Sequence, residues 1–452
     1  MNVNDNSTSW KSIAKMLIMF VIPIWLGTFF QQLYNTADAI FVGRFVGKAA
    51  LAAVGGPTAQ VVTLLIGVFV ELAAGCSVII AQYFGAGDSK KVGRALHTAM
   101  AIALICGVAI TILGLVFTPA LLKSMDVKGD VYAMSKTYLY IYFSGSLFIT
   151  VYNLGASVLR AIGDSKRPFY YLVAGCLTNI ALDYVLIYWF DMGVAGAAIA
   201  TVISQGLSSV LIVRALCALP EEYRLNFKKI GIRLNILKRM LRIGVPEAMQ
   251  QVMYSISNIM IQTNIDGFGT NTIAAMSAYS KVDVFFWMTL ESFGIAITSI
   301  SGQYYGAGQL NAIKKSVRIC LLMTAAISLV MGSLLIVFGR TLFLLFTDDL
   351  NVLSIGLDIQ RLLVPCYIVF IFVIVLAGAL RGMGHAFVPM LITLVGICLL
   401  RVVWLTVVVP KNPVLMSTLL SYPITWTLTS AAFIVYYRKK MKDEERLALR
   451  AA

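Results

Sequence analysis

The chain has 452 residues, of which 59% are hydrophobic and 13% are charged, and its mean hydropathy is +0.85. Because charged residues make up about 25% of an ordinary soluble chain, this composition excludes a soluble protein and predicts an integral membrane protein. The net charge of +15 does not indicate nucleic-acid binding, since most of the 36 lysines and arginines gather on one predicted side of the membrane, as they do in cytoplasmic loops.

Apolar runs follow one another along the whole chain, and each can form a helix of about 20 residues, enough to cross a hydrocarbon core about 30 Å thick. They predict an all-α integral membrane protein with twelve transmembrane helices, at residues 15–40, 56–81, 95–119, 132–158, 168–189, 194–216, 240–265, 280–304, 315–339, 355–379, 387–409 and 413–437. The first ten residues are polar and no small-residue cleavage pattern follows the first apolar run. We therefore expect that run to be the first span rather than a signal peptide.

The basic residues also predict the orientation of the chain. They concentrate in the N-terminal segment, in every second loop and in the C-terminal tail, so the positive-inside rule places both termini in the cytoplasm. Arg361 and Arg401 are exceptions, because they lie inside predicted spans. We expect a monomer in the plasma membrane of a bacterium, with lipid and a small-molecule substrate as its partners and no nucleic acid.

A polar phrase occurs twice in the chain. QYFGAGDSKK begins at Gln82 and QYYGAGQLNAIKK at Gln303, an offset of 303 − 82 = 221 residues. Further pairs share nearly this offset: Leu159 with Leu380, Pro168 with Pro389, Pro23 with Pro246, and Asn35 with Asn258. Two parallel six-span repeats are therefore predicted, as an N-lobe at 1–217, a cytoplasmic linker at 218–239, a C-lobe at 240–438 and a cytoplasmic tail at 439–452. Repeats of this kind typically bind a substrate between them and expose it alternately to the two sides, which predicts a transporter.

The repeated phrase itself predicts a hinge rather than a chemical site. Gly85 and Gly87 allow the chain to turn sharply out of the preceding helix. The basic residues that follow, Lys90 and Lys91 among them, would anchor the next helix among the cytoplasmic lipid headgroups.

Neither an enzyme nor an ATP-driven pump is expected. A Gly-Lys pair occurs in GRFVGKAA at 43–50, but its glycine spacing does not fit a phosphate-binding loop and it lies on the predicted outer side. The HExxH motif is absent from the sequence, and the two histidines, His97 and His385, are isolated. No cofactor is expected apart from a coupling ion, so an ion gradient is the expected source of energy.

Carboxylates inside predicted spans are the candidates for coupling, because ionisable groups are costly there and mark functional sites. They are Asp38, Glu71, Asp183, Glu247, Asp283 and Glu291. At about 1.5 Å per residue, Asp38, Asp183 and Thr201 share one layer in the outer half of the membrane. Asn179 precedes Asp183 by one helical turn, as Ala197 precedes Thr201, so each pair lies on one helix face. Such oxygens would hold Na⁺, or mutual repulsion would leave one carboxylate able to carry H⁺, and both alternatives stay open.

Several motifs in order resemble those of a known family. They are NTADAIFVGRFVG at 35–47, the twin QY[FY]GAG loops, LRAIGDSKRP at 159–168, TNIALDYVLIY at 178–188 and GVAGAAIAT at 193–201. Over essentially its whole length the chain is similar to the multidrug and toxic compound extrusion (MATE) family. The resemblance implies a twelve-helix, two-lobe antiporter that exports amphipathic, often cationic compounds in exchange for inward-moving Na⁺ or H⁺.

The resemblance also implies where the coupling ion binds. The family's N-lobe cation site falls on Asp38, Asn179, Asp183 and Thr201, with the backbone carbonyl of Ala197. Some relatives use C-lobe carboxylates as well. The resemblance assigns no family position to the carboxylates of this C-lobe, so an ion site there stays open; they are Glu247, Asp283, Glu291 and Asp358.

A cavity for organic cations is expected to combine acidic, aromatic and methionine side chains, because cations bind over aromatic rings. Spans 1, 7 and 8 offer Gln31, Tyr34, Asn35, Met253, Tyr254, Met260, Phe285 and Trp287. Two other functions stay open. A lipid-linked oligosaccharide flippase shares the wider fold but is expected to have a cationic cavity, and the loop signature of major facilitator transporters is only loosely matched by GAGDSKKVGR at 85–94.

Overall fold

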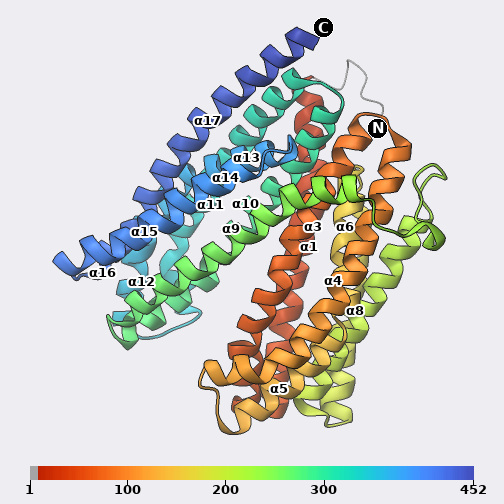
Figure 1. Cartoon of the computed structure of the whole chain (residues 1–452). Helices are drawn as coiled ribbons and strands as arrows, with labels where there is room; N and C mark the ends of the chain where they lie inside the picture. Colours follow the sequence, from red (N-terminus) through yellow and green to blue (C-terminus); the bar gives the residue numbers. More distant parts are fainter. Residues whose placement is uncertain (1–8, 452) are drawn as a thin grey trace. The chain divides into compact units, whose positions relative to one another are not determined.

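The computed structural model describes residues 9–451, which are almost entirely helical and include no β-strand (Figure 1). The first half comprises α1 (Trp10–Phe41), η2 (Val42–Val46), α2 (Lys48–Ala53), η3 (Val54–Thr58), α3 (Ala59–Gly85), α4 (Ser89–Ser124), α5 (Gly129–Ser144), α6 (Ser146–Ala161), α7 (Lys166–Asp183), η4 (Tyr184–Trp189) and α8 (Gly193–Cys217). Here η marks a short π- or 3₁₀-helical stretch. The first eight residues of the predicted N-lobe and the last residue of the predicted tail lie outside the described residues.

The second half continues in the same way. It comprises η5 (Phe227–Lys229), α9 (Leu234–Asp266), α10 (Thr270–Gly306), α11 (Leu310–Leu344), α12 (Leu350–Leu363), η6 (Val364–Cys366), α13 (Tyr367–Gly382), α14 (Phe387–Thr393), η7 (Leu394–Leu399), α15 (Leu400–Val403), η8 (Trp404–Val408), η9 (Val409–Lys411), α16 (Leu415–Leu419) and α17 (Ser421–Ala451). The all-α prediction is confirmed for the described part of the chain.

Ten helical segments of the described chain are long and apolar enough to cross a membrane, and one bent pair brings the number to eleven. The pair is α5 and α6, which meet at 54°, so the predicted fourth span at 132–158 is not one straight helix. α9, predicted as the seventh span, is a continuous helix of 33 residues. It is not among the ten, and its first half carries lysine, arginine and glutamate. The chain is a multi-pass membrane protein.

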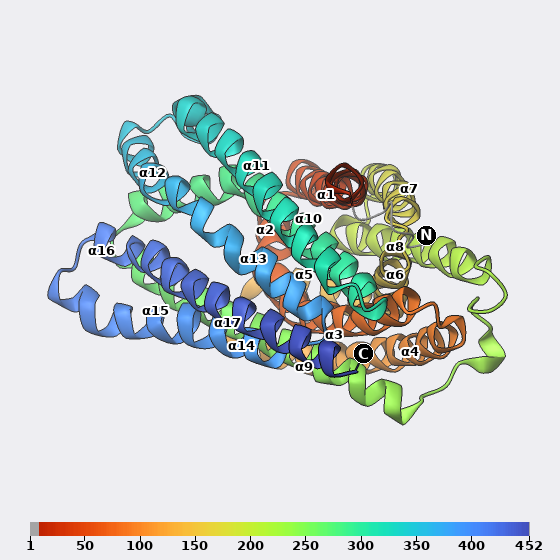
Figure 2. The same ribbon diagram turned by 90° about the horizontal axis from the view of Figure 1, so that it is seen from above.

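The helices form two compact units, which are described separately. The first unit is Ile22–Ala248, and the second contains the described residues on either side of it. Within the first unit α7 packs against α8 and α4 against α6. Within the second unit α10 packs against α13, which also lies along α17 (Figure 2).

The helix bounds repeat at a fixed offset. α4, α6 and α7 begin at residues 89, 146 and 166, while α11, α13 and α14 begin at 310, 367 and 387, so 310 − 89 = 367 − 146 = 387 − 166 = 221. The repeat predicted from the twin phrases is therefore present in the helices themselves. The predicted linker borders at 218 and 239 stay a prediction.

The twin loops have the same backbone conformation. α3 ends at Gly85 and α10 at Gly306, and two residues later Gly87 and Gly308 both have φ of +70°, a conformation that glycine adopts without steric cost. In the first loop the side chain of Asp88 then caps α4. The predicted sharp turn is confirmed in both copies.

The segment 218–233, between α8 and α9, is fastened to the start of α4. The backbone N–H of Asn226 donates to Nε2 of His97 over 3.0 Å, and the hydroxyl of Thr98 lies 3.4 Å from the carbonyl oxygen of Gly231. Because Nε2 of His97 accepts a hydrogen bond, the ring proton belongs on Nδ1, which faces the carbonyl of Gly93. His97 therefore has a structural role that its isolation in the sequence did not indicate.

Candidate functional site

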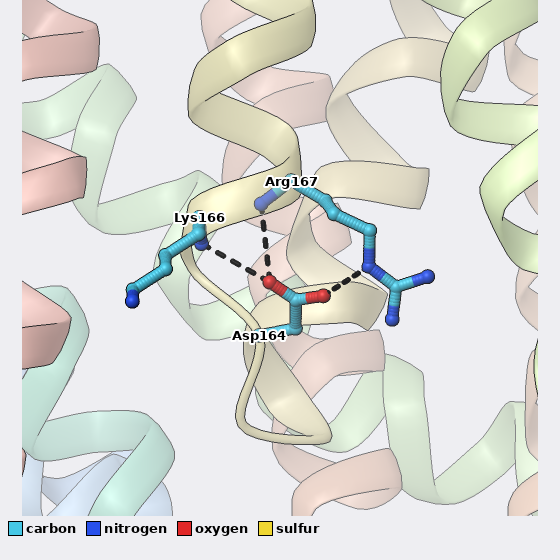
Figure 3. A network of polar contacts seen from close by, with 3 residues as sticks. All are labelled: Asp164, Lys166 and Arg167. Atoms are coloured by element: carbon cyan, nitrogen blue, oxygen red, sulfur yellow. Dashed lines mark hydrogen bonds and ion pairs between the residues drawn. The ribbon is translucent and has the colours of Figure 1, made fainter.

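α7 carries two of the predicted site residues and begins at a capped turn (Figure 3). Asp164 precedes the helix, and one of its carboxylate oxygens accepts the backbone N–H groups of Lys166 and Arg167, each over 3.1 Å. The other oxygen accepts from the side chain of Arg167. A carboxylate at this position satisfies free N–H groups and complements the helix dipole. The cap fixes where α7 starts, and Asn179 and Asp183 lie near its end.

Three of the predicted cation-site residues meet inside the first unit. The exposed fractions of Asp38, Asn179 and Asp183 are 6%, 1% and 0%. Asp183 and Asn179, from α7, both lie close enough to Asp38, from α1, to interact with its carboxylate. The equal membrane depth calculated from the sequence therefore corresponds to a real juxtaposition, while the role of these residues stays a prediction.

Most polar atoms of this group have no hydrogen-bond partner. Within residues 9–451, none is found for Oδ1 of Asp38, for both carboxylate oxygens of Asp183, or for the side-chain oxygen and nitrogen of Asn179. The carboxylates of Asp38 and Asp183 are near enough to interact electrostatically, yet the atoms named above form no hydrogen bond of acceptable distance and angle. Buried polar groups are normally paired, and two adjacent buried carboxylates repel each other when both are ionised. The arrangement is suited to receive a proton or a small cation.

Thr201 and Ala197 lie on α8 beside this group. Thr201 is 2% exposed and its hydroxyl donates to the carbonyl of Ala197 over 3.0 Å. Tyr138 of α5, which sequence reasoning missed, interacts with Thr201 and with both carboxylates. Its position shows no separate signal in the sequence, because α5 contains several tyrosines.

Non-standard helical turns occur next to both carboxylates. The π-helical stretch η4 begins immediately after Asp183, and η2 begins at Val42, one turn after Asp38. π-turns are rare and occur frequently at functional sites, since they shift side chains out of the regular helical register.

A small cavity lies beside Asn179. Its volume is about 10 Å³, and its lining includes Tyr34, Cys176, Ser204 and Gln205. This is room for about one water-sized group, far less than a drug-sized ligand needs. The cavity suits an ion or a water molecule.

The predicted substrate-cavity residues divide between the two units. In the first unit, Gln31 and Asn35 are exposed and Tyr34 is half-buried. In the second unit, Phe285 is exposed and the remaining residues are half-buried, namely Met253, Tyr254, Met260 and Trp287. Each group lies on its own unit, and their common use by one substrate stays a prediction.

Among the remaining acids, Asp283 has the most developed surroundings. It is 7% exposed and accepts hydrogen bonds from the hydroxyl of Tyr367 and the indole N–H of Trp287. The ring of Tyr367 stacks on Phe286 with centroids 4.1 Å apart. Trp287, predicted to contact substrate, therefore holds a buried carboxylate. Tyr367 had not been predicted from the sequence.

The other acids are more scattered. Glu71 is half-buried, Glu247 is buried and Glu291 is exposed. Asp358 lies 3.6 Å from Arg361 in an exposed ion pair.

Comparison with known proteins adds to this geometry. The model of the MatE family matches residues 23–185 and 246–407, one segment in each repeat. The chain is 27% identical to "Probable multidrug resistance protein YoeA" of Bacillus subtilis, over 85% of each chain. It is 27% identical to "Probable multidrug resistance protein NorM" of Thermotoga maritima, over 85% of this chain and 83% of that one.

Solved structures show the same fold. A multidrug resistance MATE family transporter in an outward-facing conformation superposes with a TM-score of 0.90, at 24% identity and over 96% of both chains. A MATE protein in a bent conformation gives a TM-score of 0.91 at 24% identity, over 97% of both chains.

Proposed function

Because the chain belongs to the MatE family of membrane transporters, we propose that it exports amphipathic, cationic compounds by alternating access, in exchange for H⁺ or Na⁺. Transport rather than catalysis is its activity. It acts as a monomer in the plasma membrane, with both termini in the cytoplasm. The match to this family favours export over the major facilitator alternative.

The buried pair of Asp38 and Asp183 is the observation that carries the proposal. Three of the four oxygens of these two neighbouring carboxylates have no hydrogen-bond partner within the described residues, and such a buried pair is stabilised when positive charge is shared between them, as a proton or a metal cation. An imported ion that neutralises the pair changes the charge seen by an organic cation. Exchange of one for the other follows from this competition.

The residues present fit either ion. For Na⁺, a hard cation that prefers oxygen ligands, Asp38, Asn179, Asp183 and Thr201 offer carboxylate, amide and hydroxyl oxygens, and Ala197 a carbonyl. For H⁺, the two carboxylates alone are sufficient. The role of Asn179 and Thr201 therefore separates the alternatives: their replacement should weaken coupling to Na⁺ more than coupling to H⁺.

The proposal is tested in proteoliposomes, with Na⁺ and pH gradients imposed separately and uptake of a cationic dye measured in inverted vesicles. One of the two gradients should drive uptake by the wild type. Asp38→Asn and Asp183→Asn should abolish it while folded protein is recovered from the membrane.

Asp126→Asn is the matched control. Asp126 has φ of +53°, a conformation that asparagine tolerates, and its side chain is 79% exposed. Normal uptake is expected. If both site variants also transport normally, the coupling proposal is wrong, and wild-type transport that ignores both gradients would favour the flippase alternative.

A further inference from the structure

Arg401 is a buried cation without an anionic partner. It lies on α15 inside the membrane-spanning segment Phe387–Lys411 and is 2% exposed. Within residues 9–451, no other lysine or arginine is buried, no ion pair involves Arg401, and its Nε has no hydrogen-bond partner.

Aromatic rings are the neighbours of this charge. The guanidinium carbon lies 4.5 Å from the ring centroid of Tyr422, on α17, and Tyr254 of α9 is also close enough to interact with it. A cation over one ring recovers only part of the cost of burying it in a membrane. Asp283, a buried carboxylate of this unit, accepts hydrogen bonds from Tyr367 and Trp287, and no ion pair joins it to Arg401 within the described residues. The charge of Arg401 is therefore available to a ligand.

The internal repeat relates Arg401 to a position beside the candidate cation site of the first repeat. With the offset of 221, Arg401 corresponds to residue 401 − 221 = 180 and Tyr422 to residue 422 − 221 = 201. These are Ile180, the neighbour of Asn179, and Thr201. The end of α7 that carries Asn179 and Asp183 thus has a cationic counterpart in the second repeat.

The helix around Arg401 contains π-helical turns, as does the helix that follows Asp183 in the first repeat. α15 has only four residues and lies between the π-helical stretches η7 and η8. η8 covers 404–408, and η4, the stretch that follows Asp183, maps to 405–410 under the same offset. Both repeats therefore interrupt the same helix with a π-turn beside a buried charge, a feature common at functional sites.

We propose that Arg401 is the anion-recognising group of a second binding site, which takes the carboxylate of an organic substrate while Tyr422 and Tyr254 contact the aromatic body. The planar guanidinium pairs with a carboxylate through two parallel hydrogen bonds. A single buried arginine matches one negative charge and not the two or more of a phosphate or pyrophosphate group. With this site the protein accepts zwitterionic compounds as well as cations.

This inference rests on the proposed transport function, since it concerns which compounds are accepted. Arg401 is covered in the present conformation, and alternating access supplies the movement that uncovers it. Tyr422 lies two residues after Leu420, where the chain turns between α16 and α17. A shift at this junction would move the ring off the guanidinium.

The test compares two dyes that differ by one methyl ester: rhodamine 110, which has a free carboxylate, and rhodamine 123, its ester. Binding to the purified full-length protein is measured by fluorescence polarisation. Arg401→Gln should weaken binding of rhodamine 110 by about tenfold or more, as expected for loss of hydrogen bonds to a charged group, and should not weaken binding of rhodamine 123, which has no carboxylate to lose.

Two further variants complete the design. Arg361→Gln removes an exposed arginine of the same unit, and both dyes should bind as in the wild type. Arg401→Lys keeps the positive charge but loses the planar guanidinium, so it should selectively weaken binding of rhodamine 110. It tests the proposal even if Arg401→Gln fails to fold.

Four results are decisive. Equal weakening of both dyes, or of neither, in the two Arg401 variants overturns the proposal. If added chloride displaces both dyes equally from the wild type, the site takes an inorganic anion and the proposal is wrong. Failure of the wild type to bind either dye counts instead against the proposed transport function. Selective loss of rhodamine 110 supports the carboxylate site.

Discussion

Gly382, the last residue of α13, offers a sharp test of the packing between α13 and α10. A Cβ added at Gly382 would lie 2.4 Å from the carbonyl oxygen of Thr298 and 2.9 Å from the backbone nitrogen of Gly302. Ordinary contact begins at 3.4 Å, so Gly382→Ala requires the helices to separate by about 3.4 − 2.4 = 1.0 Å. Both contacted atoms are backbone, and no flexible side chain can relieve the clash.

The expected cost follows from these distances. Overpacking of this kind costs about 1–3 kcal/mol, while alanine in a helix recovers about 0.5–1 kcal/mol relative to glycine. A net loss of about 1–2 kcal/mol should lower the melting temperature of the purified protein by roughly 1–2 °C, because the entropy of unfolding grows with chain length.

The control is Gly67→Ala in α3, where an added Cβ meets nothing within 4 Å. It should leave the melting temperature unchanged or raise it slightly. If Gly382→Ala is as stable as the control, α10 and α13 are not in backbone contact at this point, and the packing described for the second unit is wrong.

Two further predictions concern buried hydrogen bonds. His97→Leu removes the acceptor for the N–H of Asn226 and costs about 1 kcal/mol locally, so trypsin should cleave segment 218–233 about fivefold faster; an unchanged cleavage rate would show that the segment is held by other contacts. Tyr367→Phe keeps the stacked ring but removes a donor to buried Asp283, and the loss of about 1.5–3 kcal/mol should appear as a lower melting temperature. A Tyr367→Phe protein as stable as the wild type would contradict the hydrogen bond.

The helices and their internal repeat were the features best predicted from the sequence. Apolar runs and a fixed offset of 221 were sufficient for the helices and their repeat, because a membrane admits few backbone structures. Depth predicted that Asp38 and Asp183 share one layer of the membrane, since each helix rises by a constant amount per residue, whereas their meeting in one site was implied by the family resemblance. The place of Asn179 on the same helix face as Asp183 could be predicted because it precedes Asp183 by one helical turn.

Features that depend on tertiary partners could not be predicted. The bend between α5 and α6 has no proline in 132–158 to signal it, and it occurs at Gly145, where an added Cβ would lie 2.6 Å from Val202. The π-turn after Asp183 and the approach of Tyr138 likewise depend on neighbouring helices. Arg401 was noticed as a charge within a span, but only the structure shows it against Tyr422 and without an anion.

Competition between the coupling ion and a cationic substrate is the central claim, and equilibrium binding measures it without any membrane. The dissociation constant of rhodamine 123 for the purified protein is determined across a range of pH and, separately, of Na⁺ concentration. Affinity should fall as the coupling ion increases, and Asp183→Asn should remove this dependence. A wild-type affinity that is the same across both ranges would contradict the account.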